Sequence, residues 1–246
     1  ADRSGSTEDG RFGFRLNAAY EDERSYVREV DGKRKFVALA TNWRMTPDTV
    51  FQFDVEHERR NQNGQPYLER DVDGKLPSRV NPRTFLGQRW ARYPTESTIV
   101  SGKIEHFLNE AWSVALDANW MKLQRDQDQI WSISNIQPNG DGEAFLYYNP
   151  DQTRQPANVR FMVNGLFNTG PFSHKLDVGV DARKTTSRWG DGFWGGIGAT
   201  NIYSPVALAN PRVSVSPSVV GERIQERGVF FNDAIGFGEA WTLHLG

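Results

Sequence analysis

The apolar and polar residues of this chain alternate with a period of two over long stretches. Between Thr49 and Glu58, every second residue from Phe51 to Val55 is apolar, and the residues between them are polar or acidic. Successive side chains of a β-strand point to opposite faces, so this period predicts strands with one apolar and one polar face. The predicted strands cover Arg11–Tyr20, Arg34–Met45, Thr49–Glu58, Ser97–Leu108, Trp112–Gln124, Ala157–Asn168, Phe172–Thr186 and, less regularly, Glu222–Gly236, with a ninth cut short at Trp241–Gly246.

The connections between these strands alternate between long and short. The long ones are predicted as loops over Glu21–Lys33, Arg59–Glu96, Arg125–Gln155 and Ser187–Gly221. The short ones are turns at Thr46–Asp48, Asn109–Ala111, Thr169–Pro171 and Gly236–Ala240. Outer-membrane β-barrels have short turns at the periplasmic rim and long loops outside. Structureless loops beyond about 15 residues are uncommon in soluble domains.

Strand length separates a membrane barrel from the alternative, a soluble antiparallel sandwich. Ordinary strands have about 5–6 residues. Ten residues at ~3.3 Å each, tilted by about 40–45°, span about 23–25 Å, which is close to the apolar band of a membrane barrel. Aromatic residues also gather beside the short turns, where an interfacial girdle would lie; they are Trp43, Phe107, Trp112, Phe167, Phe172 and Trp241. The pattern therefore predicts an all-β fold, an antiparallel transmembrane β-barrel.

The predicted strands are too few to close a large barrel. Unpaired strand edges are not tolerated in hydrocarbon, and plugged transporters run to about 22 strands. We therefore expect residues 1–246 to be one β-barrel domain that is only part of a longer polypeptide.

The composition of the chain mainly argues against certain classes of function. The formal charge is −2 and the pI is near 6.1, which gives no electrostatic reason to expect a nucleic-acid partner. The chain has no cysteine, and its four histidines fall singly on separate predicted strands. No combination of nucleophile, base and orienting residue is evident. We expect no enzyme activity, no metal site and no covalently bound cofactor.

Several segments, in their order along the chain, resemble TonB-dependent siderophore receptors. Phe12–Asp22 (FGFRLNAAYED) is similar to the opening barrel strand of that family, and Leu86–Ser97 resembles its entry from loop to strand, with Arg89 where a proline is common. The further matches are Lys103–His106 with the Trp112 strand, Asn201–Val206 (NIYSPV), and Arg227–Asp233 followed by Trp241–Gly246. The resemblance covers nearly the whole chain.

The resemblance implies an outer-membrane receptor of a Gram-negative bacterium that binds a ferric siderophore and imports it with TonB-coupled energy. It also implies three partners, namely the ferric siderophore as transported ligand, TonB, and outer-membrane lipid. The family's plug domain, its TonB box and its later strands are missing from these residues, so we expect the chain to be the first part of the barrel. Polar strand residues would face the plug; they include Arg15, Gln52, Glu56, Lys103, Asp117, Arg160 and Asp181.

Other functions stay open at this point. One is a TonB-type receptor for a different cargo, such as cobalamin, a sugar or a nickel chelate. Another is a passive porin, which would have no plug. The third is a soluble, secreted β-rich binding module.

The predicted loops are rich in aromatic and basic residues, which suit a bulky and often anionic ferric chelate. Aromatic faces bury a large area, and arginines supply directed donors. The candidate ligand contacts are Tyr67, Arg89, Trp90, Arg92, Tyr93, Trp131, Tyr147, Tyr148, Trp189, Phe193 and Trp194. The alternative is that these residues pack the loops together or lie at the outer lipid interface. The family match favours a structural role for the cluster from Arg89 to Tyr93.

Overall fold

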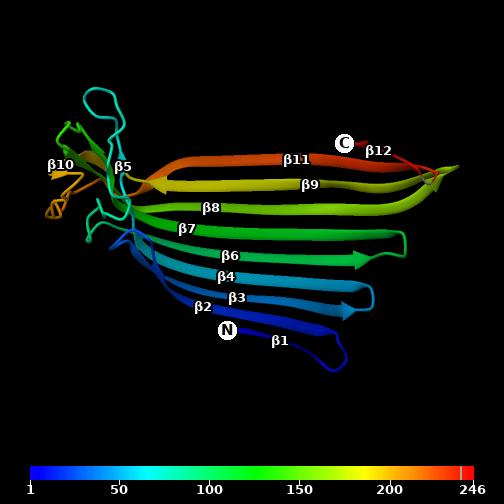
Figure 1. Cartoon of the computed structure of the whole chain (residues 1–246). Helices are drawn as coiled ribbons and strands as arrows, with labels where there is room; N and C mark the ends of the chain where they lie inside the picture. Colours follow the sequence, from blue (N-terminus) through cyan, green and yellow to red (C-terminus); the bar gives the residue numbers. More distant parts are fainter. Residues whose placement is uncertain (239) are drawn as a thin grey trace.

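Twelve strands form one sheet in which sequence neighbours pair almost throughout (Figure 1). The computed structural model describes residues 1–238 and 240–246. The strands are β1 (Asp2–Ser6), β2 (Phe12–Arg24), β3 (Asp31–Thr46), β4 (Thr49–Asn63), β5 (Tyr67–Leu68), β6 (Arg92–Phe107), β7 (Trp112–Ser134), β8 (Asp141–Thr169), β9 (Phe172–Trp189), β10 (Phe193–Asn201), β11 (Val219–Phe237) and β12 (Trp241–Leu245). Within these residues, all strand pairs are antiparallel except that of β5 with β7; β10 pairs with β8 outside the main order β1-β2-β3-β4-β6-β7-β8-β9-β11-β12. Within the described ranges, no helix is long and apolar enough to span a bilayer.

The long and short connections lie at opposite ends of the sheet, as predicted. Figure 1 shows the short turns after β3, β6 and β8 at one end and the loops with β5 and β10 at the other. In the turn between β8 and β9, Gly170 has a φ of 60°, a conformation that costs little only for glycine. The predicted turn Gly236–Ala240 includes residue 239, which lies outside the described residues; β11 ends at Phe237 and β12 begins at Trp241.

The register places apolar residues of successive strands opposite one another. Leu16 pairs with Leu39, Leu39 with Val55, Val55 with Val100, and Val100 with Trp120. Directly opposite residues share a face of the sheet. One apolar face therefore runs across the membrane-spanning part of the sheet.

This apolar face is uncovered in the chain. Many of its large side chains are exposed, Val229 to 80%, and others, such as Leu39 and Val55, are half-buried. Soluble monomers rarely expose a contiguous apolar patch that runs across so many strands. It is the face that lipid covers in a membrane barrel.

The opposite face carries alternating charges. Lys103 pairs with Asp117, Asp117 with Arg160, and Arg160 with Asp181. Opposite charges on neighbouring strands stabilise the pairing, and opposite-charge pairs are tolerated where water is present. We call this polar face the lumenal face.

The predicted aromatic girdle is confirmed for five of its six residues. Trp43, Trp112, Phe167, Phe172 and Trp241 lie on the apolar face near the short turns.

The prediction that Phe107 belongs to the aromatic girdle is wrong. Ile104 lies on the apolar face, and Phe107 is three positions further along β6. An odd spacing puts the two side chains on opposite faces, so Phe107, which pairs with Ser113, lies on the lumenal face. The prediction used only its distance from the turn and ignored the period of two.

The strands extend further than predicted, and the predicted long loops are correspondingly shorter. The connections reduce to residues 25–30, 64–91, 135–140 and 190–218, and the last of these contains β10. Beyond the membrane both faces of a strand can meet water, so the alternation fades while backbone pairing continues. Ion pairs support the extension, since Arg34 contacts both Glu21 (3.1 Å) and Glu58 (2.6 Å).

The strand β1 was not predicted at all. Its five residues, Asp2–Ser6, are polar or glycine, so they carry no apolar period. Arg15 of β2 holds it through an ion pair with Asp2 at 2.6 Å.

The hydrophobic core lies in the loop end rather than in the membrane-spanning part. Two clusters of buried residues pack there; one comprises Leu86, Ile133, Ile136 and Ile202, and the other Ala91, Ile130, Ala144 and Leu146. Residues of the second, third and fourth connections thus pack into ordered structure that can hold functional side chains in place.

Candidate functional site

Four aromatic rings from four strands meet at the loop end of the sheet. Tyr147 of β8 pairs with Trp194 of β10, and Tyr67 of β5 lies beside Ser132 of β7. Trp131 is the extra residue of a β-bulge in β7, between Ile130 and Ser132. The bulge leaves Trp131 without a residue directly opposite it in β8, and its indole lies against the rings of the neighbouring strands. We call Tyr67, Trp131, Tyr147 and Trp194 the aromatic strip.

Trp131 is the centre of the aromatic strip. Its ring centroid lies 5.5 Å from that of Tyr67, 5.9 Å from Tyr147 and 5.6 Å from Trp194. Tyr147 and Trp194 are 5.7 Å apart. All four distances and the tilted or edge-on angles are those of favourable aromatic pairs. Tyr67 is 67% exposed and Trp194 53%, so the strip keeps an open surface.

The register assigns the aromatic strip to the lumenal side of the sheet. Arg125 pairs with Gln152, and Gln127 pairs with Asn149. One residue separates these positions in β7 and two separate them in β8, so the extra residue of this bulge is in β8. The alternation along β7 is therefore unbroken from Asp117, on the lumenal face, to Gln129. Because Gln129 pairs with Tyr147, the strip continues the lumenal face beyond the membrane.

The opposite side of the same strands is packed. Ile130 pairs with Leu146, and Leu208 and Val213 of the fourth connection pack against them. The aromatic strip thus rests on strands that are held from behind by a hydrophobic core.

Below the strip, a network of amides continues along the lumenal face. Gln152 donates to the Gln127 side chain (2.7 Å) and to the Asn149 carbonyl (3.0 Å). Arg125 donates to Gln152 (3.0 Å) and to the Tyr93 hydroxyl (3.4 Å). Gln127, Asn149 and Gln152 are themselves buried, so the network ties β7 to β8 close to the rings.

Further toward the membrane, the lumenal face contains a hollow of about 250 Å³. Its walls include the basic residues Arg125 and Arg154, the aromatic Trp189 and the acidic Glu222. We call it the lumenal hollow.

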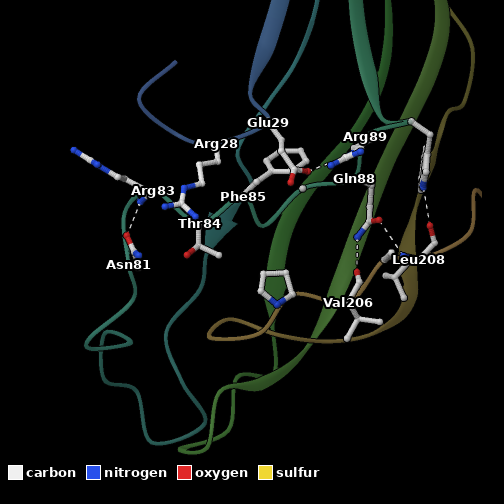
Figure 2. A pocket seen from close by; sticks show the side chains of 14 residues that line it. Arg28, Glu29, Asn81, Arg83, Thr84, Phe85, Gln88, Arg89, Val206 and Leu208 are labelled. Carbon is white, nitrogen blue, oxygen red and sulfur yellow. Dashed lines mark hydrogen bonds and ion pairs between the residues drawn. The ribbon is translucent and has the colours of Figure 1, made fainter. Parts of the chain in front are cut away.

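A larger cavity, of about 440 Å³, lies among three connections (Figure 2). Arg28, Arg83 and Arg89 contribute to its walls, and Arg89 contacts the Glu29 carboxylate at 2.8 Å. That guanidinium holds the pKa of Glu29 below its usual range.

A buried glutamine joins the second connection to the fourth. Gln88 donates from Nε2 to the Val206 carbonyl (2.9 Å), and its Oε1 accepts from the Leu208 amide (3.0 Å), as Figure 2 shows. The indole of Trp90 donates to the Leu208 carbonyl at 2.8 Å. We call residues 204–213 the strap, and these hydrogen bonds hold it against the second connection.

Beneath the strap lies Asp128, on the side of β7 opposite to the aromatic strip and beyond the membrane-spanning part. It borders a cavity of about 300 Å³ with Tyr148 and Arg212. Burial raises the pKa of Asp128 to about 6. The same surroundings, with Asp128 nearby, raise the pKa of Tyr148.

The structure brings together four of the eleven candidate ligand contacts, and those four form the aromatic strip. The other seven lie apart from it: Arg89, Trp90, Arg92, Tyr93, Tyr148, Trp189 and Phe193. Trp90, Tyr148 and Phe193 pack against the core, and Arg92 contacts Asp31 at 3.0 Å.

Sequence reasoning missed the amide network. Gln127, Gln129, Asn149 and Gln152 lie in a segment predicted as a loop, where polar amides carry no signal. Only the register of β7 with β8 reveals that they share one face.

No protein-family model matches the chain. Among curated proteins, the ferrichrome receptor FcuA of Yersinia enterocolitica is 24% identical over 212 residues, which cover 83% of this chain and 27% of that protein. The metal-pseudopaline receptor CntO of Pseudomonas aeruginosa (strain UCBPP-PA14) is 24% identical over 178 residues, covering 71% of this chain and 24% of that protein. The chain thus spans about a quarter of the length of the curated relatives that it matches.

Solved structures give the same picture of the fold. The ferric preacinetobactin receptor BauA of Acinetobacter baumannii superposes with a TM-score of 0.85 at 15% identity, over 97% of this chain and 36% of that one. The ferripyoverdine receptor of the outer membrane of Pseudomonas aeruginosa, bound to ferripyoverdine, gives 0.76 at 17% identity, over 97% and 33%.

The relatives found by sequence and by structure are receptors. The resemblance to TonB-dependent siderophore receptors, predicted from the sequence, is confirmed by both comparisons. The fold is an open part of an antiparallel transmembrane β-barrel.

Proposed function

We propose that this chain is part of the wall of a receptor that binds a ferric siderophore and imports it across the outer membrane with TonB-coupled energy. The observation that carries the proposal is the aromatic strip, four rings on the lumenal side of a barrel wall, above the membrane. A bulky chelate can stack on such rings, which the buried amide network holds in place from below.

The relatives support the choice of cargo. Their names specify ferrichrome, metal-pseudopaline, ferric preacinetobactin and ferripyoverdine as ligands. In our proposal the ferric siderophore is a transported ligand, and the protein carries no covalently bound cofactor and no catalytic activity.

The proposal includes the domain organisation and the partners. Residues 1–246 act as one β-barrel unit of a longer receptor, whose apolar face meets outer-membrane lipid. The lumenal face meets a plug, through which TonB is engaged. The candidate ligand contacts are the residues of the aromatic strip, whereas Arg89, Trp90, Arg92, Tyr93, Tyr148 and Phe193 hold the loops in place.

Uptake of radioactive iron tests this function. The full-length receptor is expressed in a Gram-negative host that lacks other siderophore receptors, and ⁵⁵Fe is supplied as a panel of ferric siderophores. We expect saturable uptake of at least one of them, abolished in a strain without TonB.

The rival functions give different results. A passive porin gives uptake that neither saturates nor depends on TonB. A receptor for another cargo takes up cobalamin, a sugar or a nickel chelate but not iron. A soluble binding module stays in the aqueous phase when cells are fractionated without detergent.

A further inference from the structure

The lumenal hollow differs in charge from much of the lumenal face. Several basic groups elsewhere on this face have acidic neighbours; Lys103 contacts Glu105 at 3.0 Å, Arg183 contacts Glu226 at 3.8 Å, and Arg160 lies in register between Asp117 and Asp181. Over residues 1–238 and 240–246, no ion pair within 4.0 Å involves Arg125 or Arg154.

The partners of the two arginines are neutral or lacking. Among the described residues, Arg125 donates to the Gln152 side chain and the Tyr93 hydroxyl, which are both neutral. Arg154 is exposed on the lumenal face, where it pairs in register with Ser187. An arginine without a carboxylate partner keeps its full charge and its directed donors for a ligand.

The acidic residue of the hollow does not neutralise them. Glu222 accepts a long hydrogen bond, 3.4 Å, from the Ser187 hydroxyl. Three arginines, Arg125, Arg154 and Arg188, line the hollow together with one carboxylate, although the register of Arg188 with Thr153 assigns its side chain to the opposite face. The hollow is therefore positive, and a concave basic surface concentrates anions. Trp189 adds an aromatic side to the same hollow.

The lumenal hollow and the aromatic strip are two separate places on the same face of the sheet. Tyr147 and Arg154 are seven residues apart on β8, which is roughly 20 Å at ~3.3 Å per residue. The amides of Asn149 and Gln152 lie between them on the same face. A single small chelate cannot contact both ends at once.

We infer that the lumenal hollow is a second binding station, below the aromatic strip, for the anionic oxygen-rich part of the transported chelate. The inference rests on the proposed function and narrows it: the imported ferric chelate carries net negative charge, from carboxylates or catecholates. The strip binds its apolar or aromatic part first, and the arginines of the hollow bind the anionic part afterwards.

Dissociation constants of the full-length receptor, purified in detergent, test the inference. The probes are a neutral ferric tris-hydroxamate, an anionic ferric citrate complex and a trianionic ferric tris-catecholate. The variants are Arg154→Gln and Glu222→Gln. The matched control is Arg223→Gln, next to Glu222 in β11 but paired with Thr186 on the opposite face.

We expect an anionic chelate to bind tightest to the unmodified receptor. Loss of one charge-assisted hydrogen bond in Arg154→Gln should weaken that binding about tenfold. Glu222→Gln should strengthen it severalfold, because a repelling charge is removed. Arg223→Gln should leave it unchanged.

Three results would overturn the inference and leave the proposed function standing. The first is tighter binding of the neutral chelate, and the second is equal effects of Arg154→Gln and Arg223→Gln. The third is a lower melting temperature of ligand-free Arg154→Gln with unchanged affinity, which would mean that another part of the polypeptide fills the hollow. If no iron chelate binds at all, the proposed function falls and the inference falls with it.

Discussion

Trp131 shows how one residue can assemble a site from several strands. Two residues beyond the lumenal Gln129, its ring lies within 5.9 Å of three others, from β5, β8 and β10. The aromatic strip therefore depends on Trp131 and on the register that brings the other three rings to it.

We predict that Trp131→Ala weakens binding of the transported ferric chelate by tenfold or more, because aromatic pairs contribute about 0.5–1.5 kcal/mol each. Equilibrium binding to whole cells measures the effect. Trp43→Ala, which removes a tryptophan on the lipid side near the short turns, is the control. Equal affinities for the two variants would contradict the role of the strip.

The buried carboxyl of Asp128 should make the stability of the strap depend on pH. Its pKa is raised by burial from 3.8 to about 6, so the folded strap favours the protonated carboxyl. The protonated Asp128 carboxyl therefore makes its full contribution to the stability of the folded strap below pH about 4, and this contribution is lost as the pH rises through about 6. We expect the strap to be more resistant to a pH-tolerant protease at pH 4.5 than at pH 7.5.

The control for this prediction is Asp128→Asn, which cannot ionise at that position. The variant should be as resistant at pH 7.5 as the unmodified receptor is at pH 4.5. Retention of the full pH difference in Asp128→Asn would show that a different group is responsible.

At the scale of the elements, the hairpin of β7 and β8 dominates the loop end. It supplies Trp131 and Tyr147, the amide network and most of the buried core. The strap and the second connection pack against it, so the site is built on strands rather than on irregular loops.

The strap should be sensitive to one glutamine. Gln88 is 6% exposed and satisfies both the Val206 carbonyl and the Leu208 amide. We predict that Gln88→Ala releases the strap, because each buried group left without a partner costs about 1–3 kcal/mol. Faster hydrogen exchange of the strap amides would report this, with the exposed Gln137→Ala as control. Unchanged exchange would show that Trp90 and the core hold the strap alone.

The sequence predicts the membrane-spanning strands well because one physical constraint acts on all of them. Lipid on one side and polar surroundings on the other impose a period of two, as in Thr49–Glu58. Outside the membrane this constraint ends. Residues such as Asp141–Gln155 pair as strands without a lipid face, so they were predicted as loops.

The candidate site could be predicted only in part, for the same reason. Aromatic residues in the loops are visible in the sequence, but which of them meet depends on long-range register. Trp194 pairs with Tyr147 across 47 positions of the chain, whereas Phe193, its direct neighbour, packs into the core.

At the scale of the whole molecule, the two faces of the sheet should respond oppositely to added charge. Leu116 is 44% exposed on the apolar face, and Asn119 lies on the lumenal face of the same strand. We predict that Leu116→Lys destabilises the folded barrel by about 2–4 kcal/mol, the cost of lysine near the middle of a bilayer. Asn119→Lys should have little effect. The fraction of full-length receptor that migrates as heat-modifiable folded barrel measures both, and similar losses would contradict the assignment of the faces.

The central claim is that the transported ferric chelate binds to the lumenal side of this wall, on the aromatic strip. The chain contains no cysteine, so a fluorophore can be attached to a single Gln129→Cys or Asp128→Cys in a full-length receptor otherwise free of cysteine. These positions are adjacent in β7 but lie on opposite faces. Quenching by the ferric chelate that the receptor imports is the measurement. We predict saturable quenching at position 129 and little at 128; equal quenching at both, or quenching at 128 alone, would contradict the account.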